Sequence, residues 1–230
     1  MKRLLSALRA VLFPKMSAWA TIALLPVLLL ASAIYAPRLL AFPYHAQFGT
    51  TDVYSVQPIH PRLGAELARA DALLAQSPLY TGPVTRQIYL TDGGWRWTVL
   101  ALNLRGAAAL RRALNNAIIV NRADVANDLM DLHWPIGGRR SLSSVVAHET
   151  THILETQHFG LVKGAMSPQW MVEGYADYVA QESSLSDDDV RRVEAKHDPN
   201  PALPYYYGRR RVAAVLAHNG GSVDRLFNQN

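Results

Sequence analysis

The longest run of apolar positions lies near the N-terminus of the chain. Residues 16–37 carry no charged side chain and are rich in Leu, Ala and Ile. A run of this length is just enough to cross a bilayer as a helix. Four basic residues precede it, namely Lys2, Arg3, Arg9 and Lys15, whereas only Arg38 follows it closely. The positive-inside rule therefore predicts one transmembrane helix with a cytoplasmic N-terminus and the bulk of the chain in the periplasm or outside the cell.

A cleaved signal peptide is the alternative for this segment, because Ala31-Ser32-Ala33 resembles a cleavage site. The apolar run is longer than the usual 7–15-residue core of a signal peptide, so an uncleaved anchor is preferred. We therefore predict two parts. Residues 1–38 form a cytoplasmic tail and membrane anchor, and residues 39–230 form one domain large enough to bury its own core.

The first half of this domain shows mostly short, strand-like segments. Residues 42–61 contain Pro, Gly and Thr and read as a linker and a loop leading into the domain. Helical spacing of apolar residues predicts a helix over 62–76, and residues 86–90 and 117–121 are typical of strands. The second of these strands is either an exposed edge, able to pair with an extended peptide, or a central strand. Residues 95–104 fit a strand or a helix, and 124–138 are irregular.

The second half reads as a series of helices. Ser141-Leu142-Ser143-Ser144 offers N-caps for the first helix, and Gly160 stops it. The second helix follows Pro168. Ser186 starts a third with a capping box, residues 205–218 form a fourth, and Ser222 caps a short last helix. Strands first and helices after predict an α+β fold with a small N-terminal strand region and a helical second half.

Charge and composition exclude two classes of function. Five of the 23 Lys and Arg residues lie in residues 1–38, which contain no acidic residue. The remaining 18 basic residues balance the 18 acidic residues of the domain, so the basic pI reports the anchor and not a nucleic-acid surface. Because the chain has no Cys, it has no disulfide framework, no thiolate zinc ligand and no thiol nucleophile.

The first predicted helix carries His148-Glu149-Thr150-Thr151-His152, an H-E-x-x-H motif. Residues four apart on a helix lie about 40° apart around its axis, so both imidazoles face the same side and can bind one metal ion. Glu149 lies beside the first of them, where it can take a proton from a water that the metal activates. This spacing predicts a metal centre with His148 and His152 as ligands.

A catalytic zinc site needs a third protein ligand. His158 has the spacing of the metzincin pattern, but Glu155 stands where that pattern has a chain-turning Gly. On a continuing helix His158 lies about 240° around the axis from His152 and points away. Glu173, 21 positions after His152 on the second helix, is therefore preferred. Asp177 follows it by one turn and can fix the tautomer of a ligand His.

Together, H-E-T-T-H and the downstream W-x-x-E-G-x-A-D-Y over residues 170–178 resemble the gluzincin metallopeptidases, of which thermolysin is the type, and within them the small peptidase-MA-like group. The resemblance covers roughly residues 141–230 and says little about substrate. It implies a zincin-type catalytic half in which His148, His152 and Glu173 hold Zn²⁺. It also implies that Glu149 is the base and that Asp177 orients His148.

The resemblance also implies a hydrogen-bond donor for the developing oxyanion, supplied from the C-terminal helices. The candidates are Tyr205, Tyr206 and Tyr207, with His218 as a weaker one. Successive helical positions face different ways, so at least two of the three tyrosines are expected to be packing or surface residues. Gly174 is expected to allow close approach of another helix.

The sequence thus predicts a membrane-anchored zinc peptidase with a polypeptide substrate; it leaves the oligomeric state open. A zinc-holding peptide-binding module, a zinc hydrolase of another substrate, and a tethered structural protein with an accidental motif are the alternatives. Glu149 argues against the binding module, because a site that only binds has no use for a base there.

Overall fold

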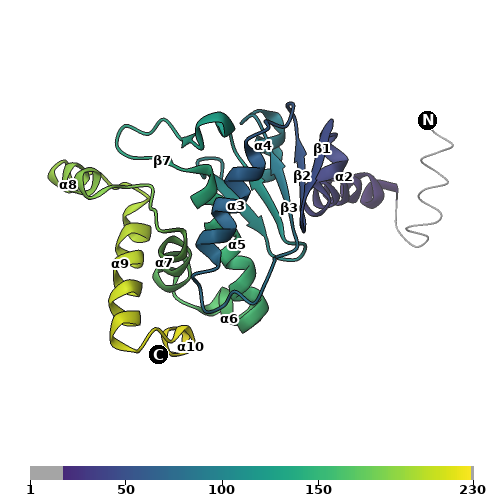
Figure 1. Cartoon of the computed structure of the whole chain (residues 1–230). Helices are drawn as coiled ribbons and strands as arrows, with labels where there is room; N and C mark the ends of the chain where they lie inside the picture. Colours follow the sequence, from purple (N-terminus) through teal and green to yellow (C-terminus); the bar gives the residue numbers. More distant parts are fainter. Residues whose placement is uncertain (1–17, 229–230) are drawn as a thin grey trace. The chain divides into compact units, whose positions relative to one another are not determined.

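The computed structural model describes residues 18–228, which belong to two compact units, Met1–Ala41 and Phe42–Asn230 (Figure 1). The described part of the first unit is an α-helix, α2 (Ala18–Tyr35), and a 3₁₀ helix, η1 (Pro37–Leu40). Helix α2 carries Pro26 in its interior and has no charged residue. The start of the predicted span and its four basic flanking residues lie outside the described residues.

None of the described helices combines the length and apolarity needed to span a bilayer.

The second unit is built on a five-stranded sheet of order β1-β2-β3-β5-β4. Its strands are β1 (Tyr44–Phe48), β2 (Thr51–Ser55), β3 (Arg86–Leu90), β4 (Ala109–Arg112) and β5 (Ala117–Val120). The central strands β2, β3 and β5 run parallel, while β1 and β4 are antiparallel to their neighbours. The strands over 86–90 and 117–120 confirm the sequence prediction, but the linker predicted over 42–61 is wrong. This segment forms the β1–β2 hairpin, because Gly49, at a φ of 56°, permits a tight turn between two short strands.

The strand predicted as a possible edge is a central strand. β5 lies between β3 and β4, and all four of its residues are buried. Within the described residues the outer strands are β1 and β4 instead. The continuous apolar run Ala-Ile-Ile-Val is the signature of a strand covered on both faces, which explains the outcome.

Two helices cover one face of the sheet, α3 (Leu63–Leu74) and α5 (Leu142–Phe159) (Figure 1). Alternate strand residues such as Val53, Ile88 and Ile118 pack with them in one buried cluster. Helix α4 (Trp95–Ala101) resolves the ambiguous segment as helical. The described fold is therefore a mixture of helices and strands, with α3 and α4 inserted among the strands and not only after them.

Helix α5 is the central helix of the unit. Ser141 is its N-cap and accepts a hydrogen bond from the backbone N–H of Ser144, as the sequence predicts, and Gly160 ends the helix at a φ of 81°. The two Thr of the motif are completely buried, and each hydroxyl donates to the carbonyl one turn earlier. Arg86 of β3 also donates to the Thr150 hydroxyl at 3.0 Å, which joins the helix to the sheet.

Helix α7 (Gln169–Ala180) packs against both α5 and α9 (Leu203–His218). A Cβ placed on Gly174 would lie 2.5 Å from the backbone carbon of Gly208 on α9. The expectation that Gly174 permits a close helix approach is therefore confirmed.

The remaining elements lie around these helices. A two-stranded sheet is formed by β6 (Met130–Asp131) and β7 (Arg139–Arg140), after the short 3₁₀ helix η2 (Val125–Asn127). Helix α8 (Asp187–Ala195) begins with the predicted Ser186 capping box, and α10 (Val223–Phe227) begins at the predicted Ser222 cap. The short α6 (Leu161–Met166) was not predicted.

Candidate metal centre

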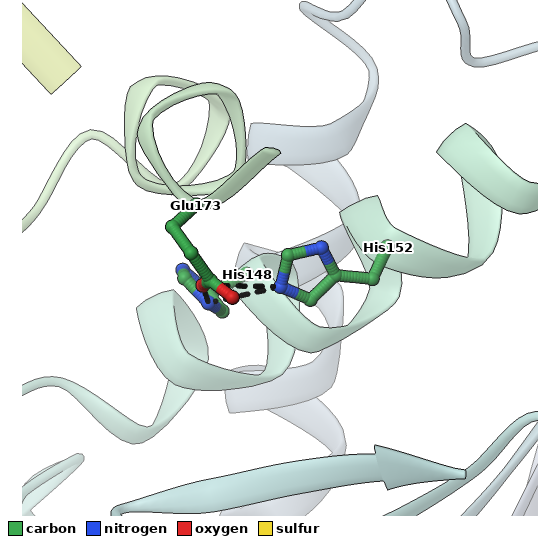
Figure 2. A group of neighbouring side chains, drawn as sticks. All are labelled: His148, His152 and Glu173. Carbon is green, nitrogen blue, oxygen red and sulfur yellow. Dashed lines mark hydrogen bonds and ion pairs between the residues drawn. The ribbon is translucent and has the colours of Figure 1, made fainter. Parts of the chain in front are cut away.

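Three side chains from two helices converge at one point of the second unit (Figure 2). His148 and His152 come from successive turns of α5, and Glu173 reaches them from α7. The Nε2 atoms of His148 and His152 lie 3.2 Å apart. Oε2 of Glu173 lies 3.2 Å from Nε2 of His148 and 3.5 Å from Nε2 of His152. The structure thus brings together the three residues that the sequence predicted as ligands, in a group that can hold a metal ion.

The spacing of the three donor atoms fits a tetrahedral ion. Metal–ligand bonds of 2.0–2.1 Å at tetrahedral angles place neighbouring donors about 3.3 Å apart. The observed separations of 3.2, 3.2 and 3.5 Å are close to this edge length. A set of two imidazole nitrogens and one carboxylate oxygen also leaves a fourth tetrahedral position for water or substrate.

In both His148 and His152, the ring nitrogen that faces away from the group, Nδ1, is hydrogen-bonded to a carboxylate. Nδ1 of His148 donates to Oδ1 of Asp177 at 2.8 Å, and Nδ1 of His152 donates to Oε2 of Glu155 at 2.9 Å. When the two rings are neutral, these bonds leave the two Nε2 lone pairs facing each other and the Glu173 carboxylate. Three acceptors aimed at one point repel one another unless a cation lies between them, so the donor set itself fits a metal.

The electrostatics of the group favour positive charge at the same point. Burial works against protonated His148, but hydrogen bonds to Asp177 and Glu173 outweigh it and raise its pKa to about 9. The pKa of His152 is likewise raised against the effect of burial, through the negative charges of Glu173 and Glu155. Burial would raise the pKa of Glu173, yet the two histidines hold it well below its usual value. A divalent cation would replace the protons on these rings.

Glu149 lies next to His148 on α5 and is buried, with a relative exposure of 8%. Burial raises the pKa of its carboxyl, against the opposing effect of His148 and His152. A buried carboxylate with a raised pKa, next to a group of side chains that can hold a metal ion, is a candidate general base.

The three candidate tyrosines separate as helix geometry requires. The ring of Tyr205 lies 6.5 Å from that of His148, between centroids. Burial and the nearby Glu173 raise the pKa of Tyr205 to about 12, so its hydroxyl stays protonated at neutral pH. Only Tyr205 of the three has a ring contact with a ligand side chain in the described structure.

Tyr206 and Tyr207, also predicted as candidates, have partners elsewhere. The Tyr206 hydroxyl donates to Asp187 at 2.8 Å and accepts from Arg210, and its ring packs in a separate buried cluster with Leu185 and Val190. Tyr207 is 46% exposed, and its hydroxyl donates to Glu194. Consecutive positions on α9 differ by about 100° in direction. For this reason only one of the three tyrosines can face the group of His148, His152 and Glu173, which we call the metal group.

The competing histidines also lie away from the group. Helix α5 continues unbroken through Glu155, so His158 is carried to an exposed position, where its Nε2 lies 2.8 Å from Oδ1 of Asp224. The His218 ring bonds to the Ala214 carbonyl one turn earlier on α9. Both observations agree with the choice of Glu173 as the third ligand.

Several supporting residues escaped the sequence analysis. Glu155, three residues after His152, could have been found from its i,i+3 spacing on the same helix. Arg140 gives no such signal, yet its guanidinium is buried and donates to Asp177 at 2.9 Å. The opposing charges of Arg140 and His148 hold the pKa of Asp177 below its usual value despite its burial. Arg111 of β4 donates to Thr156 on α5 at 2.8 Å.

No protein-family model matches the chain, and a comparison with curated proteins finds no match either.

Proposed function

We propose that the chain is a zinc-dependent peptidase whose catalytic domain is anchored to a membrane outside the cytoplasm. One observation carries the proposal: two imidazoles and a carboxylate converge at tetrahedral spacing, with the buried Glu149 beside them on the same helix. The resemblance of both sequence motifs to gluzincins supports zinc as the metal and peptide hydrolysis as the reaction.

His148, His152 and Glu173 would hold the zinc ion, which supplies Lewis acidity that lowers the pKa of a water and polarises the scissile carbonyl. Glu149 accepts the proton of the attacking water and passes it to the leaving amine. Its raised pKa suits both steps, because the group must accept a proton and then release it near neutral pH. Asp177 and Glu155 keep the two ligand rings in the tautomer that offers Nε2.

Tyr205 is the candidate donor to the oxygen of the scissile carbonyl. Its hydroxyl remains protonated, and it comes from α9, a different element from either ligand helix. A preorganised donor of this kind stabilises the charge that develops in the transition state.

The edge strand β4 supports a polypeptide substrate. It pairs with β5 on one side and is an outer strand of the sheet, and its Arg111 is bonded to α5, the helix that carries Glu149. An extended peptide that adds to the outer side of β4 would run near α5. We therefore propose β4, and not residues 117–121, as the edge strand that pairs with an extended peptide.

The anchor is a proposal from the sequence. The uncharged run over 16–37 and its basic N-terminal flank support a single-pass arrangement with residues 39–230 outside the cytoplasm. The substrate would then be an exported or envelope polypeptide, or the outer segment of a membrane protein.

The metal assignment is tested on the full-length chain, with Glu173→Ala compared with His158→Ala. We expect one zinc per chain in the wild type and in His158→Ala, and loss of zinc in Glu173→Ala, as measured by elemental analysis after dialysis. Zinc retained in Glu173→Ala but lost in His158→Ala would show that the third ligand is His158.

The reaction is tested with Glu149→Gln on a mixture of peptides from a digested, denatured protein. We expect the variant to keep zinc and fold but to lose at least about a hundredfold in turnover, the scale of a lost general base. Equal hydrolysis by wild type and variant would exclude the mechanism. Zinc binding with no peptide hydrolysis by the wild type would favour a hydrolase of another substrate or a peptide-binding module.

A further inference from the structure

The two helices that supply the metal ligands are joined by a second set of polar contacts, at the start of α5 and the end of α7. Arg140, the last residue of β7, immediately precedes the N-cap of α5. Its guanidinium donates through Nη1 to Oδ1 of Asp177 at 2.9 Å and through Nη2 to the Glu182 carbonyl at 3.2 Å. Nη2 also donates to the Ser144 hydroxyl at 3.0 Å. One buried side chain therefore connects both helices.

Glu182 makes the reciprocal connection. It follows the C-cap of α7, Gln181, and its Oε2 accepts from the backbone N–H of Ser141 at 2.9 Å and from the Ser141 hydroxyl at 2.8 Å. The residue that begins α5 is thus bonded to the segment that ends α7. We call Arg140, Ser141, Asp177 and Glu182 the helix clamp.

The clamp leads directly to the metal group through one atom. Oδ1 of Asp177 accepts from both Arg140 Nη1 and His148 Nδ1, so the guanidinium fixes the carboxylate that fixes the imidazole. Asp177 also lies one helical turn beyond Glu173, on the same face of α7. The position of the clamp therefore sets both the rotation of a His ligand and the placement of the helix that carries the Glu ligand.

We infer that Arg140 is a positioning residue for the metal centre, and that the affinity for zinc depends on the fork-shaped contact of its guanidinium with Asp177, Ser144 and Glu182. The inference rests on the metal centre of the proposed function. Within the described chain, the hydrogen bonds of the Arg140 guanidinium go to these three residues and not to a ligand side chain. A mutation that removes the hydrogen-bond partner of a metal ligand typically weakens metal affinity by about 10–100-fold.

The test uses Co²⁺ and Zn²⁺ on the full-length chain, because Co²⁺ reports the geometry of its ligands through its visible absorption. We expect Arg140→Gln to weaken the affinity for both ions by about 10–100-fold and to change the Co²⁺ spectrum. Arg140→Lys should restore the affinity only in part, since one ammonium keeps the charge but lacks the planar fork. Full restoration by Lys would overturn the geometric role.

Two further variants separate positioning from a general effect on stability. Arg86 is also buried and also bonds to α5, through Thr150, but it has no hydrogen bond to the clamp. Arg86→Gln should lower the melting temperature and leave the Co²⁺ spectrum unchanged. In an Asp177→Ala background, Arg140→Gln should have less than about a twofold further effect on affinity, because its action passes through Asp177.

If Arg140→Gln does not unfold cooperatively, Ser144→Ala provides the measurement instead, because it removes one side-chain acceptor of the guanidinium, and the same direction is expected. Cooperative unfolding together with unchanged metal affinity and an unchanged Co²⁺ spectrum in either variant would overturn the inference while leaving the proposed function intact. A wild-type chain that binds neither Co²⁺ nor Zn²⁺ would overturn both.

Discussion

At the scale of single residues, the hydrogen-bond partners of a histidine decide whether its ring can take part in the candidate metal centre. His148 and His152 differ from the other histidines of the chain because each donates its Nδ1 proton to a buried carboxylate. His158, six positions after His152 on the same helix, pairs with Asp224 in an exposed position. The residue type is the same, and the environment decides the chemistry.

Tyr205 gives the prediction that belongs to this scale. Tyr205→Phe removes the hydroxyl of a ring that lies 6.5 Å from the His148 ring, between centroids. Zinc and fold should be retained while kcat falls by about 10²–10³, the scale of one lost oxyanion donor. Because the donor acts in the transition state, KM should change much less. The matched control is Tyr207→Phe, whose hydroxyl bonds to Glu194, and its kinetics should equal those of the wild type. Equal kcat values for the two variants would remove Tyr205 from the mechanism.

At the scale of elements, the packing of α7 on α9 determines where Glu173 lies. Gly174 and Gly208 meet backbone to backbone, and a Cβ at Gly174 would lie 2.6 Å from the Gly208 carbonyl oxygen. Backbone cannot move aside as the end of a flexible side chain can. The residue after a proposed metal ligand is therefore also a point of backbone-to-backbone contact between α7 and α9.

Gly174→Ala should destabilise the fold by about 1–3 kcal/mol, because one added methyl forces α7 and α9 apart. The same shift moves the neighbouring Glu173, so zinc affinity should fall as well. Gly164→Ala is the control: that glycine lies in α6, an added Cβ would meet no atom within 4 Å, and Ala is a better helix former by up to about 1 kcal/mol. Thermal unfolding and zinc titration of both variants check this. A Gly174→Ala protein as stable as the wild type would show that the helices can separate without cost.

At the scale of the whole molecule, the proposed membrane topology would decide which polypeptides the domain meets. Residues 39–230 carry equal numbers of acidic and basic residues, so the net positive charge of the chain, which would orient it in the proposed arrangement, lies in its N-terminal segment. Along the sequence, the boundary between the two compact units falls between Ala41 and Phe42, a few residues after the predicted end of the anchor.

A reporter enzyme that needs an oxidising compartment, fused after Asn230, should therefore be active. Replacing Lys2, Arg3, Arg9 and Lys15 by Gln should reduce its activity, because the orientation depends on those charges. A C-terminal reporter active only in the cytoplasm would reverse the arrangement. Release of an intact domain beginning near Ile34 would show that the segment is a cleaved signal peptide.

The sequence by itself determined the features that depend on local spacing. The caps at Ser141, Ser186 and Ser222 are confirmed, since a cap depends on residues within one turn of the chain. The pairing of His148 with His152 follows from the i,i+4 geometry of one helix. The exclusion of His158 was also local, because it rested on whether the helix continues through Glu155.

Only the tertiary structure decided the features that join distant segments. The hairpin within 42–61 and the central place of β5 depend on which strands pair, and pairing is not recorded in the local pattern of a short apolar run. The selection of Tyr205 among three adjacent tyrosines depends on the direction from which α9 meets α7. Arg140 reaches Asp177 across 37 positions of sequence, and contacts of that kind exist only once packing has brought the two helices together.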